Sequence, residues 1–482
     1  METSAIIDTD VAIIGAGTAG MSAYRAVLAH TRRVLLIESG HYGTTCARVG
    51  CMPSKLLIAA ADAAHSAAGA ARFGVSVGSV EIDGRAVMAR VRSERDRFVG
   101  FVIDAVQQWP AEHRLVGHAR FIDDATLQVG STLVRAARIV IATGSRPSVP
   151  ETWRTALGDR VIVNDDVFDW GDLPKSVAVV GAGVIGLELA QALHRLGVRV
   201  RLYGRGTMVG PLTDPELQAQ TRHLFAAELP MTLNVARLEP RREGDTVVVR
   251  ATAGDGTMTE ERFEWLLAAT GRKPNVDRLG LENTTLPLDR EGVPVYDRRS
   301  AQVTQRPIFI AGDVSDDRTL LHEAADEGRI AGDNAGRYPD VRMRPRRAPL
   351  AVVFSDPQIA LAGASHAELN AAGITFLTGR VSFSDQGRSR VMGENRGALH
   401  LYGEAGTGRF LGAEMVGPAA EHVGHLLSWS AQRGDTVQQM LDSPFYHPVV
   451  EEGVRTALRD LQHQLHLGLM PVERCLDCGP GA

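Results

Sequence analysis

Two glycine motifs, each placed between a short apolar run and a helical stretch, constrain the fold of this chain more than any other feature. Residues 10–38 read DVAIIGAGTAGMSAYRAVLAHTRRVLLIE, and residues 176–205 read SVAVVGAGVIGLELAQALHRLGVRVRLYGR. Each segment begins with an apolar run typical of a buried parallel strand, continues through G-A-G-x-x-G into a helical pattern, and returns to a β-branched run. A strand, a glycine turn, a helix and a second strand form the unit that binds a dinucleotide. The sequence therefore predicts an α/β fold with two Rossmann-like dinucleotide-binding domains.

The three glycines of each motif have separate roles. The first permits the tight turn, the second lets the backbone approach a pyrophosphate, and the third lets the helix pack against the strand. The helix N-terminus adds N–H donors and a partial positive charge for the phosphates. These roles fall to Gly15, Gly17 and Gly20 in the first unit and to Gly181, Gly183 and Gly186 in the second.

The residue 23 positions after the first glycine distinguishes the two units. In the first unit it is Glu38, where a carboxylate binds a ribose hydroxyl, but in the second it is Gly204, followed by Arg205. A carboxylate there accepts the 2′-OH of NAD and repels the 2′-phosphate of NADP, whereas an Arg does the reverse. Arg205 is equally interpretable as a solvated loop charge. The second unit therefore predicts a nicotinamide cofactor, NAD(H) or NADP(H), without choosing between them.

A further repeat indicates how the domains are arranged. RIVIATGSRPSVP at 138–150 parallels WLLAATGRKPNVD at 265–277, since both are apolar strands that end in Ala-Thr-Gly, Arg and Pro. The region after about residue 346 lacks such glycine patterns and has alternating and helical stretches. We expect a first domain at 1–150 that continues at 276–345, a second domain at 151–275, and a C-terminal α+β domain at 346–482.

Composition excludes several classes of protein. The 52 Lys and Arg against 57 Asp and Glu give a net charge of −5, and no block is strongly basic, so nucleic acid is not an expected partner. No charge-free window is long enough to span a bilayer, and the N-terminus lacks the pattern of a signal peptide. We expect a cytoplasmic protein that does not bind membranes. In that reducing compartment four cysteines do not form a disulfide scaffold.

Two of the four cysteines lie together in the segment YGTTCARVGCMPSK, residues 42–55. Cys46 and Cys51 are five residues apart at an expected helix start, where two thiols can lie close enough to bridge. The amides of a helix N-terminus lower a thiol pKa and favour the nucleophilic thiolate. The alternatives are a zinc half-site and a pair of buried thiols, but zinc needs two more ligands and none is obvious nearby. We interpret the pair as a redox-active disulfide and expect no metal cofactor.

These motifs resemble the pyridine nucleotide–disulfide oxidoreductase family over about residues 8–465. The resemblance is carried by GAGTAG, GTTCARVGCMPSK, GVIGLELA, AATGRKPN, FIAGDV, LLHEAADEG and YHPVVEE. Within the family the chain is most similar to the dihydrolipoamide dehydrogenases, although glutathione, thioredoxin, mycothione and mercuric reductases share most of these motifs. The resemblance implies that the first unit binds FAD. It also implies that the C-terminal domain forms a homodimer with shared active sites.

The resemblance further implies residue roles. Cys51 would lie beside the flavin as a thiolate, and Cys46 would exchange with the substrate. Lys55 would lie near the flavin, paired with Glu188, and His447 would carry protons in the partner's site. The orienting carboxylate for His447 would be Glu452, with Glu451 as the alternative. Cofactor contacts are implied for Glu38, Thr45, Lys55, Gly117, Ala119, Thr143, Gly144, Arg205, Gly271 and Asp313, the last preceded by Gly312 and placed at the ribityl chain.

The predicted function is an FAD-dependent dithiol–disulfide oxidoreductase, most similar to dihydrolipoyl dehydrogenase, acting on lipoamide or on the lipoyl domain of a separate chain. The alternative is an NADPH-dependent disulfide or metal reductase that uses Cys475 and Cys478 as a relay. That second pair is also interpretable as an incidental feature of the tail or as a metal half-site. A non-catalytic binding module is a further alternative, but the intact set of Cys46, Cys51, Lys55 and His447 argues against it.

Overall fold

The structure is a computed structural model that describes residues 5–466, and its first sheet is built from two distant parts of the chain. The strands are β1 (Ile6–Ile14), β2 (Val34–Glu38), β3 (Arg114–Val116), β4 (Ala119–Phe121), β5 (Thr126–Val129), β6 (Thr132–Ile141) and β17 (Ile308–Ile310). They follow the order β3-β2-β1-β6-β5-β4, with β17 paired to β6. β1, β2, β3, β6 and β17 run parallel, whereas β4 and β5 form an antiparallel edge. The chain therefore leaves this sheet after β6 and returns to it at β17.

Helices α1 (Thr18–Val27) and α9 (Leu321–Arg337) pack against each other beside this sheet. The close approach depends on small residues, because a Cβ added to Gly328 would lie 2.1 Å from the carbonyl oxygen of Ala19. One turn further on, a Cβ on Gly332 would lie 2.3 Å from the carbonyl oxygen of Ala23. Helix α9 is thus held in one position over the first glycine turn.

The second glycine unit forms a separate parallel sheet with the order β11-β10-β9-β15-β8. Its strands are β8 (Val161–Ile162), β9 (Ser176–Val180), β10 (Arg199–Tyr203), β11 (Met231–Thr232) and β15 (Trp265–Ala268). Helices α7 (Val184–Arg195) and α8 (Pro215–Ala226) belong to this part, together with an antiparallel sheet of β12 (Val235–Glu243), β13 (Thr246–Ala253) and β14 (Met258–Phe263). The two Ala-Thr-Gly segments meet where β7 (Ser145–Pro147) pairs with β16 (Arg272–Pro274).

The C-terminal part is an antiparallel sheet with the order β18-β19-β22-β21-β20. The strands are β18 (Leu350–Val353), β19 (Gln358–Gly363), β20 (Phe376–Ser382), β21 (Ala398–Glu404) and β22 (Phe410–Gly417). Helices α12 (Ala420–Arg433) and α14 (Glu452–Leu465) pack on this sheet. The expected α/β architecture with a C-terminal α+β domain is confirmed. The remaining helices are α2 (Thr45–Val49), α3 (Cys51–Ala68), α4 (Gly84–Gln107), α5 (Glu151–Leu157), α6 (Asn164–Val167), α10 (His366–Ala371), α11 (Gly387–Met392) and α13 (Val437–Leu441).

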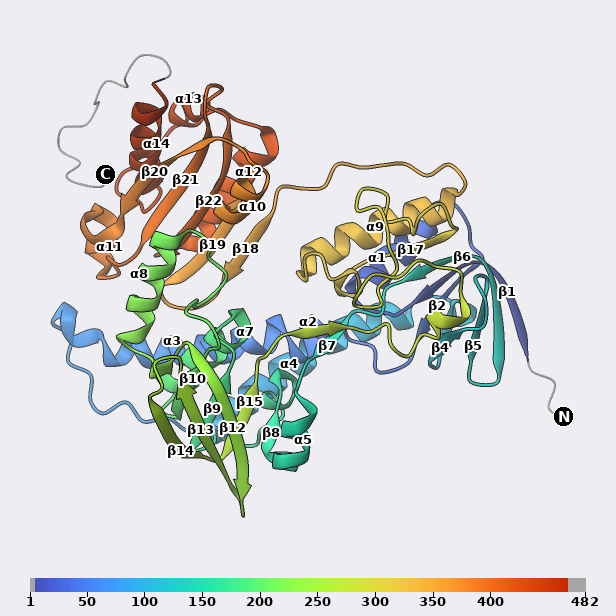
Figure 1. The fold of residues 1–482 in the computed structure, drawn as a ribbon, viewed down its shortest axis with the longest axis horizontal. Coiled ribbons are helices and arrows are strands. Elements are labelled where there is room, and N and C mark those ends of the chain that lie inside the picture. Colours follow the sequence, from blue (N-terminus) through green and yellow to red (C-terminus); the bar gives the residue numbers. More distant parts are fainter. Residues whose placement is uncertain (1–4, 467–482) are drawn as a thin grey trace.

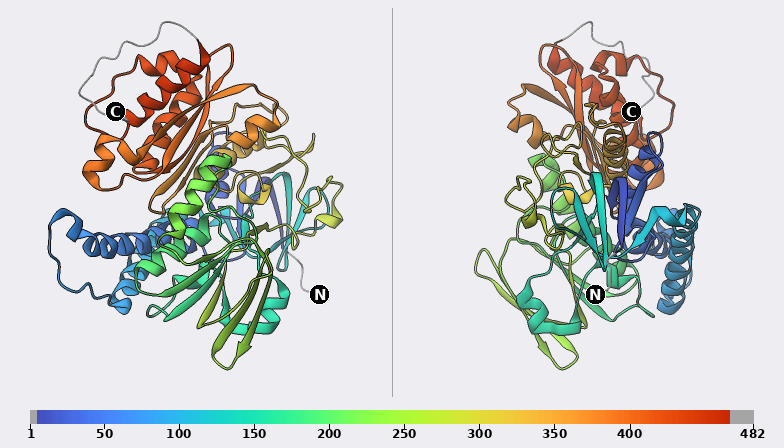
Figure 2. Two further views of the ribbon diagram at one scale, coloured as in Figure 1. Left: turned by 60° about the vertical axis from the view of Figure 1, so that its left-hand side comes forward. Right: turned by 90° about the vertical axis from the view of Figure 1, so that its right-hand side faces the viewer.

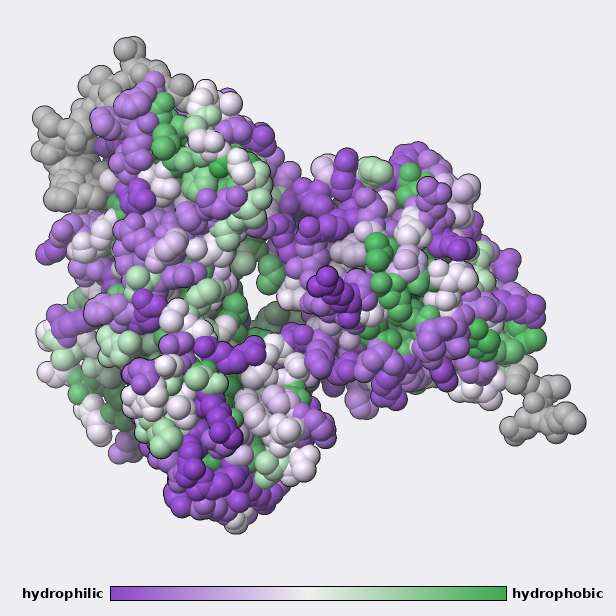
Figure 3. All heavy atoms as spheres, in the orientation of Figure 1, coloured by the Kyte–Doolittle hydropathy of each residue, from purple (hydrophilic) through white to green (hydrophobic). Residues whose placement is uncertain are grey.

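The first sheet, the second sheet and the C-terminal sheet each lie in a separate lobe, and a linker that follows α9 leads from the first lobe to the C-terminal lobe (Figure 1). Helix α8 lies between the second sheet and the C-terminal lobe (Figure 2). There Asp214, just before α8, bonds to the buried ring of His400 with a 2.8 Å contact to Nδ1. The face shown in Figure 3 is largely polar and is hollowed where the lobes meet. Within residues 5–466, none of the helices has the length and apolar character needed to cross a bilayer.

Candidate active site

The first glycine turn is shaped to admit a phosphate at one position and to exclude side chains at the other two. Gly15 has φ +105°, and a Cβ there would lie 2.3 Å from the carbonyl oxygen of Ala142. A Cβ on Gly20 would lie 1.8 Å from the Gly15 carbonyl oxygen, so the helix can pack only without a side chain. By contrast, a Cβ on Gly17 would meet nothing within 4 Å. Gly17 therefore borders open space, which suits the close backbone approach of a pyrophosphate.

The second turn repeats this geometry. A Cβ on Gly181, which has φ +120°, would lie 2.1 Å from the Ala269 carbonyl oxygen. A Cβ on Gly186 would lie 1.8 Å from the Gly181 oxygen, whereas one on Gly183 would again meet nothing within 4 Å. Gly271, with φ +110°, also faces open space. Both turns therefore have the form required to hold a dinucleotide.

Two contiguous cavities lie beside the first turn and share Gly17, Thr45, Ala142 and Gly144. One, of about 510 Å³, contains Glu38 at the end of β2. The other, of about 450 Å³, contains the thiols. The Glu38 carboxylate accepts the Ala16 N–H at 2.7 Å, so it is fixed at the edge of the first cavity. Of the other residues expected to contact FAD, Gly15, Gly117, Ala119 and Thr143 line the first cavity, and Lys55, Gly312 and Asp313 line the second.

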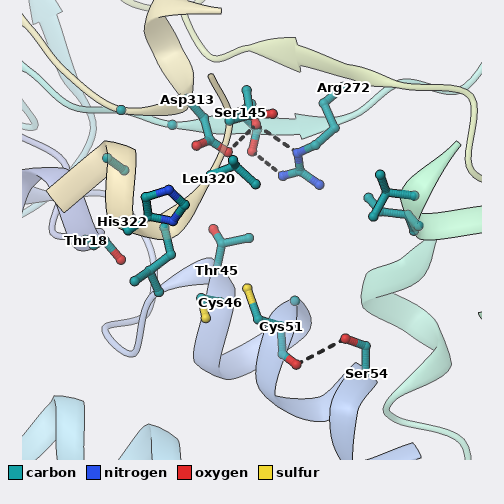
Figure 4. Close-up of a pocket in the computed structure, with 18 of the residues that line it drawn as sticks. Thr18, Thr45, Cys46, Cys51, Ser54, Ser145, Arg272, Asp313, Leu320 and His322 are labelled. Carbon is teal, nitrogen blue, oxygen red and sulfur yellow. Dashed lines mark hydrogen bonds between the residues drawn. The ribbon is translucent and has the colours of Figure 1, made fainter. Parts of the chain in front are cut away.

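Cys46 and Cys51 lie on opposite sides of a break in the helix. Cys46 belongs to α2 and Cys51 begins α3, because Gly50 between them has φ −128° and ψ −119°. Both are free thiols here, and Figure 4 shows Cys46 on α2 and Cys51 at the start of α3, with His322 across the cavity. Within residues 5–466 no three His, Cys, Asp or Glu side chains are placed to hold a metal ion.

The two thiols are electrostatically unequal. The hydrogen bond from Cys46 and then the positive charge of Lys55 outweigh burial and lower the pKa of Cys51 to about 6. The same hydrogen bond, followed by burial, raises the pKa of Cys46 above its ordinary value. Near neutral pH the pair therefore consists of a Cys51 thiolate that accepts a hydrogen bond from a Cys46 thiol. This arrangement suits a nucleophile and its protonated partner.

Lys55 lies one turn beyond Cys51 on α3 and reaches the second glycine unit. Its Nζ is 2.8 Å from Oε2 and 3.0 Å from Oε1 of Glu188 on α7. Glu188 is 4% exposed and also accepts the Phe354 N–H at 2.9 Å, while Nζ lies 4.6 Å from the centre of the Phe354 ring. A single ion pair thus joins the redox helix, the second nucleotide unit and the C-terminal domain beside the thiols.

Asp313 is held by residues from the segment that joins the two nucleotide units. Ser145 Oγ donates to Asp313 Oδ2 at 3.0 Å, and Arg272 donates to Ser145 from Nε at 2.8 Å. Arg272 also donates to the Ser145 carbonyl oxygen at 2.8 Å. Asp313 lines the cavity of the thiols, so this chain of bonds fixes a carboxylate that faces the space expected for the flavin.

A side chain at position 204 of the second unit would meet apolar neighbours. A Cβ on Gly204 would lie 2.8 Å from Leu233 Cδ2 and 3.3 Å from the Cβ of Ala182. Arg205 beside it is exposed, and within residues 5–466 no hydrogen bond or ion pair of its side chain is seen. The position that holds Glu38 in the first unit is therefore apolar and tightly packed in the second.

His447 and Glu452 form a pair on the C-terminal domain, away from the thiols of the same chain. Nδ1 of His447 lies 3.0 Å from Oε2 and 3.1 Å from Oε1 of Glu452, whereas Glu451 is the residue before the helix. Glu452 is 1% exposed and also accepts from Arg455 and from the Val449 N–H, while the His447 side chain is 56% exposed. His447 does not line the cavity of Cys46 and Cys51. The pair thus presents an oriented imidazole outward.

Sequence reasoning missed several residues that line the cavity of the thiols. Arg272 and Ser145 sit in the Ala-Thr-Gly segments, but their contact follows from the pairing of β7 with β16, which the motifs do not encode. His322 belongs to the motif LLHEAADEG, which marked the family without indicating that its ring faces the thiols. The expected relay residues Cys475 and Cys478 lie outside the described residues.

Comparisons with known proteins match nearly the whole chain. The pyridine nucleotide-disulphide oxidoreductase family matches residues 9–328, and the dimerisation domain of the same family matches residues 350–458. A mercuric reductase of Streptomyces lividans is 32% identical over 457 residues, covering 91% of this chain and 93% of the relative. Dihydrolipoyl dehydrogenase 2 of Haloarcula marismortui is 30% identical over 464 residues, covering 93% and 96%.

Solved structures show the same fold. The HOCl-induced flavoprotein disulfide reductase RclA from Escherichia coli superposes with a TM-score of 0.76 at 22% identity, covering 95% of this chain and all of that one. LpdA from Mycobacterium tuberculosis gives a TM-score of 0.78 at 24% identity, covering 94% and 99%. These two likenesses establish the fold alone.

Proposed function

The chain belongs to the pyridine nucleotide-disulphide oxidoreductase family, whose members use FAD and NAD(P)H, and on this basis we propose that it is a dihydrolipoyl dehydrogenase. It would oxidise dihydrolipoamide, free or on the lipoyl domain of a separate chain, with NAD⁺ as acceptor. The dimerisation domain supports a homodimer. We further propose that residues 1–150 and 276–345 form the FAD domain, because β17 returns to the sheet of β1 and β6.

The thiols would carry the chemistry in two exchanges. A substrate thiolate attacks the Cys46 sulfur of the Cys46–Cys51 disulfide, forms a mixed disulfide with Cys46, and releases Cys51 as a thiolate. The second substrate thiol then attacks the substrate sulfur of that mixed disulfide, closes the lipoamide ring and releases Cys46. The product state holds a Cys46 thiol beside a Cys51 thiolate, which are the protonation states that the raised pKa of Cys46 and the lowered pKa of Cys51 favour. Bound FAD would accept the electron pair from the thiols and pass it to the nicotinamide.

The observation that carries this proposal is the His447–Glu452 pair. Oxidising a dithiol releases two protons, of which Cys46 keeps one as a thiol, and an imidazole held by a buried carboxylate is suited to accept the other. Since His447 is exposed and lies apart from the thiols of its own chain, it would serve the partner subunit's thiols. Lys55 would keep a positive charge near the reduced cofactor, with Glu188 fixing its position.

The test is a comparison of electron donors and acceptors. Under anaerobic conditions we expect dihydrolipoamide to bleach the bound flavin, and NAD⁺ to restore its colour with release of NADH. Turnover is then measured with three electron donors, dihydrolipoamide, glutathione and reduced thioredoxin, each with NAD⁺ or NADP⁺. It is also measured with the acceptor Hg²⁺ and NADH or NADPH. Activity with dihydrolipoamide and NAD⁺ exceeding that with the other pairs supports the proposal. Absence of dihydrolipoamide turnover in a fully flavin-loaded protein refutes it.

A second candidate is an NADPH-dependent disulfide or metal reductase. It is favoured by Gly204 and the exposed Arg205, since the carboxylate that would select NAD is missing. The similarity to mercuric reductases also supports it. Anaerobic reduction of the flavin by NADH and NADPH in parallel separates the two candidates. A rate with NADPH more than tenfold above that with NADH would favour the reductase and weaken the dehydrogenase assignment.

A further inference from the structure

The turn at Gly312 and Asp313 is held by a hydrogen bond to the buried carboxylate of Glu327. Gly312 has φ +81°, and a Cβ there would lie 2.8 Å from Ala19 Cβ on α1 and 3.5 Å from Ala324 Cβ on α9. Its N–H donates to Oε2 of Glu327 at 2.7 Å. Because α1 and α9 pack through glycines, Glu327 on α9 is held in one place relative to the first glycine turn. The backbone that presents Asp313 to the cavity is therefore tied to one side chain.

Glu327 is buried, with 3% exposure, so its charge needs a partner. Burial raises its pKa, while Arg346 and the Gly312 N–H oppose that effect. Its second oxygen, Oε1, lies 2.8 Å from Nη2 of Arg346, an ion pair without directed hydrogen-bond geometry. The same Nη2 donates to Glu323, which is 2% exposed. One guanidinium thus serves two buried carboxylates beneath the turn.

Arg346 does not belong to the first domain's helices but to the linker that leads to the C-terminal domain. This linker, residues 338–349, follows α9 (Figure 1) and is fastened to it by arginines. Arg344 lies 2.7 Å from Asp333, and Arg347 lies 2.7 Å from Asp326. These two pairs tie the linker to the helix, whereas Arg346 reaches the carboxylate that holds Gly312.

We propose that Arg346 and Glu327 are positioning residues for FAD. Arg346 keeps Glu327 ionised, and Glu327 as a carboxylate holds the Gly312 N–H and thereby orients Asp313. This inference rests on the proposed role of Asp313 as a flavin ligand. It makes flavin affinity depend on the seating of the linker, and hence on the domain that forms the dimer.

Loss of Arg346 would leave Glu327 without its cation, whereas Glu323 would keep Arg318, whose Nη1 lies 3.8 Å from Glu323 Oε1. Glu327 would then take up a proton, and a protonated Glu327 accepts the Gly312 N–H less strongly than a carboxylate does. The side chain of Asp313 would then be less well oriented. Because Asp313 is expected to contact the flavin, FAD affinity should fall by about tenfold or more.

The experiment compares Arg346→Met with Arg344→Met, which removes a neighbouring arginine of the same linker from a pair on the same helix. Holoprotein is diluted serially, and the fluorescence of free flavin gives the FAD dissociation constant. We expect a rise of about tenfold or more for Arg346→Met and less than about twofold for Arg344→Met. Arg346→Lys, which keeps the charge, should recover part of the loss. Thermal midpoints of both Met variants check that the fold is retained.

Separate variants test the role of Arg346 and Glu327 and the expected contact of Asp313 with the flavin. Equal loss in Arg346→Met and Arg344→Met, or no loss in Arg346→Met, would overturn the inference. If Arg346→Met does not fold, Glu327→Gln replaces it, and unchanged FAD affinity in that variant would overturn the inference equally. Asp313→Ala tests the premise independently. Normal FAD affinity in Asp313→Ala would show that the proposed flavin contact is wrong, whatever Arg346 does.

Discussion

Replacing Cys46 with Ala removes the hydrogen bond that contributes most to the low pKa of Cys51. The ordinary thiol pKa is 9.0 and that of Cys51 is about 6. At about pH 7.5 these values correspond to about 3% and about 97% thiolate respectively, a difference of roughly 30-fold. We therefore expect the pKa of Cys51 in Cys46→Ala to move up from about 6 towards 9.0. Cys46→Ser is the matched control, because its hydroxyl can still donate a hydrogen bond to the thiolate.

The assay must be a pH profile rather than a single rate. A thiolate becomes more nucleophilic as its pKa rises, by roughly 20-fold over a change of this size, so the alkylation rate near pH 7.5 would hardly differ between variants. Iodoacetamide alkylation is measured from pH 5 to pH 10 in a Cys475→Ser/Cys478→Ser background. Since the chain has 4 cysteines, Cys51 is then the thiol that reacts. An inflection that stays near pH 6 in Cys46→Ala, or rises equally in Cys46→Ser, would refute the reasoning.

Three further predictions follow from the geometry. Gly17→Ala should fold with an unchanged thermal midpoint, because its Cβ meets nothing within 4 Å, but it should bind FAD more weakly, because that Cβ enters the space expected for the pyrophosphate. Gly20→Ala should fail to fold, because its Cβ would lie 1.8 Å from the Gly15 carbonyl oxygen. Glu452→Gln should lower dihydrolipoamide turnover by about 100-fold while sparing flavin reduction by the nicotinamide, since general acid–base catalysis contributes at least that factor; equal loss of both rates would contradict this role. Burial alone would raise the pKa of Asp214, but bonds from His400 and backbone N–H groups lower it to about 2, so its stabilising effect is complete above pH 3.8 and is lost as the pH falls through about 2. Asp214→Asn should therefore reduce the free energy of unfolding at pH 7 by about 2 kcal/mol, measured by urea denaturation, and unchanged stability would count against the pair.

The parts of the molecule that could be predicted from the sequence are those in which a local backbone requirement dictates a residue type. Gly15 and Gly20 are required because a Cβ at either would collide with a carbonyl oxygen, so the fold class follows from the motif. Helix α14 (Glu452–Leu465) is one of the helical stretches that the sequence predicts after residue 346, because its apolar positions recur at helical spacing. In each case the constraint acts over a few residues, which is the range that a pattern can record.

The parts that could not be predicted depend on contacts between distant segments. Arg272 and Ser145 meet because the strands that contain them pair in one register, across 127 residues of sequence. Glu327 looks like a solvated helix charge until the approach of α1 and the linker buries it. The break at Gly50 was also missed, since a continuous helix from Cys46 onward fits the sequence equally well. Such features arise from packing, and their residues carry no distinguishing spacing.

The two nucleotide units share a backbone geometry, so their residues can be compared position by position. Their first and third glycines are required by the same collisions, and in both the first glycine donates its N–H to the strand residue that precedes the selecting position, Ile37 or Tyr203, at 2.8 Å. Positions 38 and 204 are therefore structurally equivalent, and their difference cannot be a shift of register. Glu38 reaches back to the turn, whereas Leu233 and Ala182 pack where a side chain of residue 204 would begin. The second unit thus retains the phosphate cradle but lacks the carboxylate, so the contact that Glu38 makes in the first unit has no counterpart in the second.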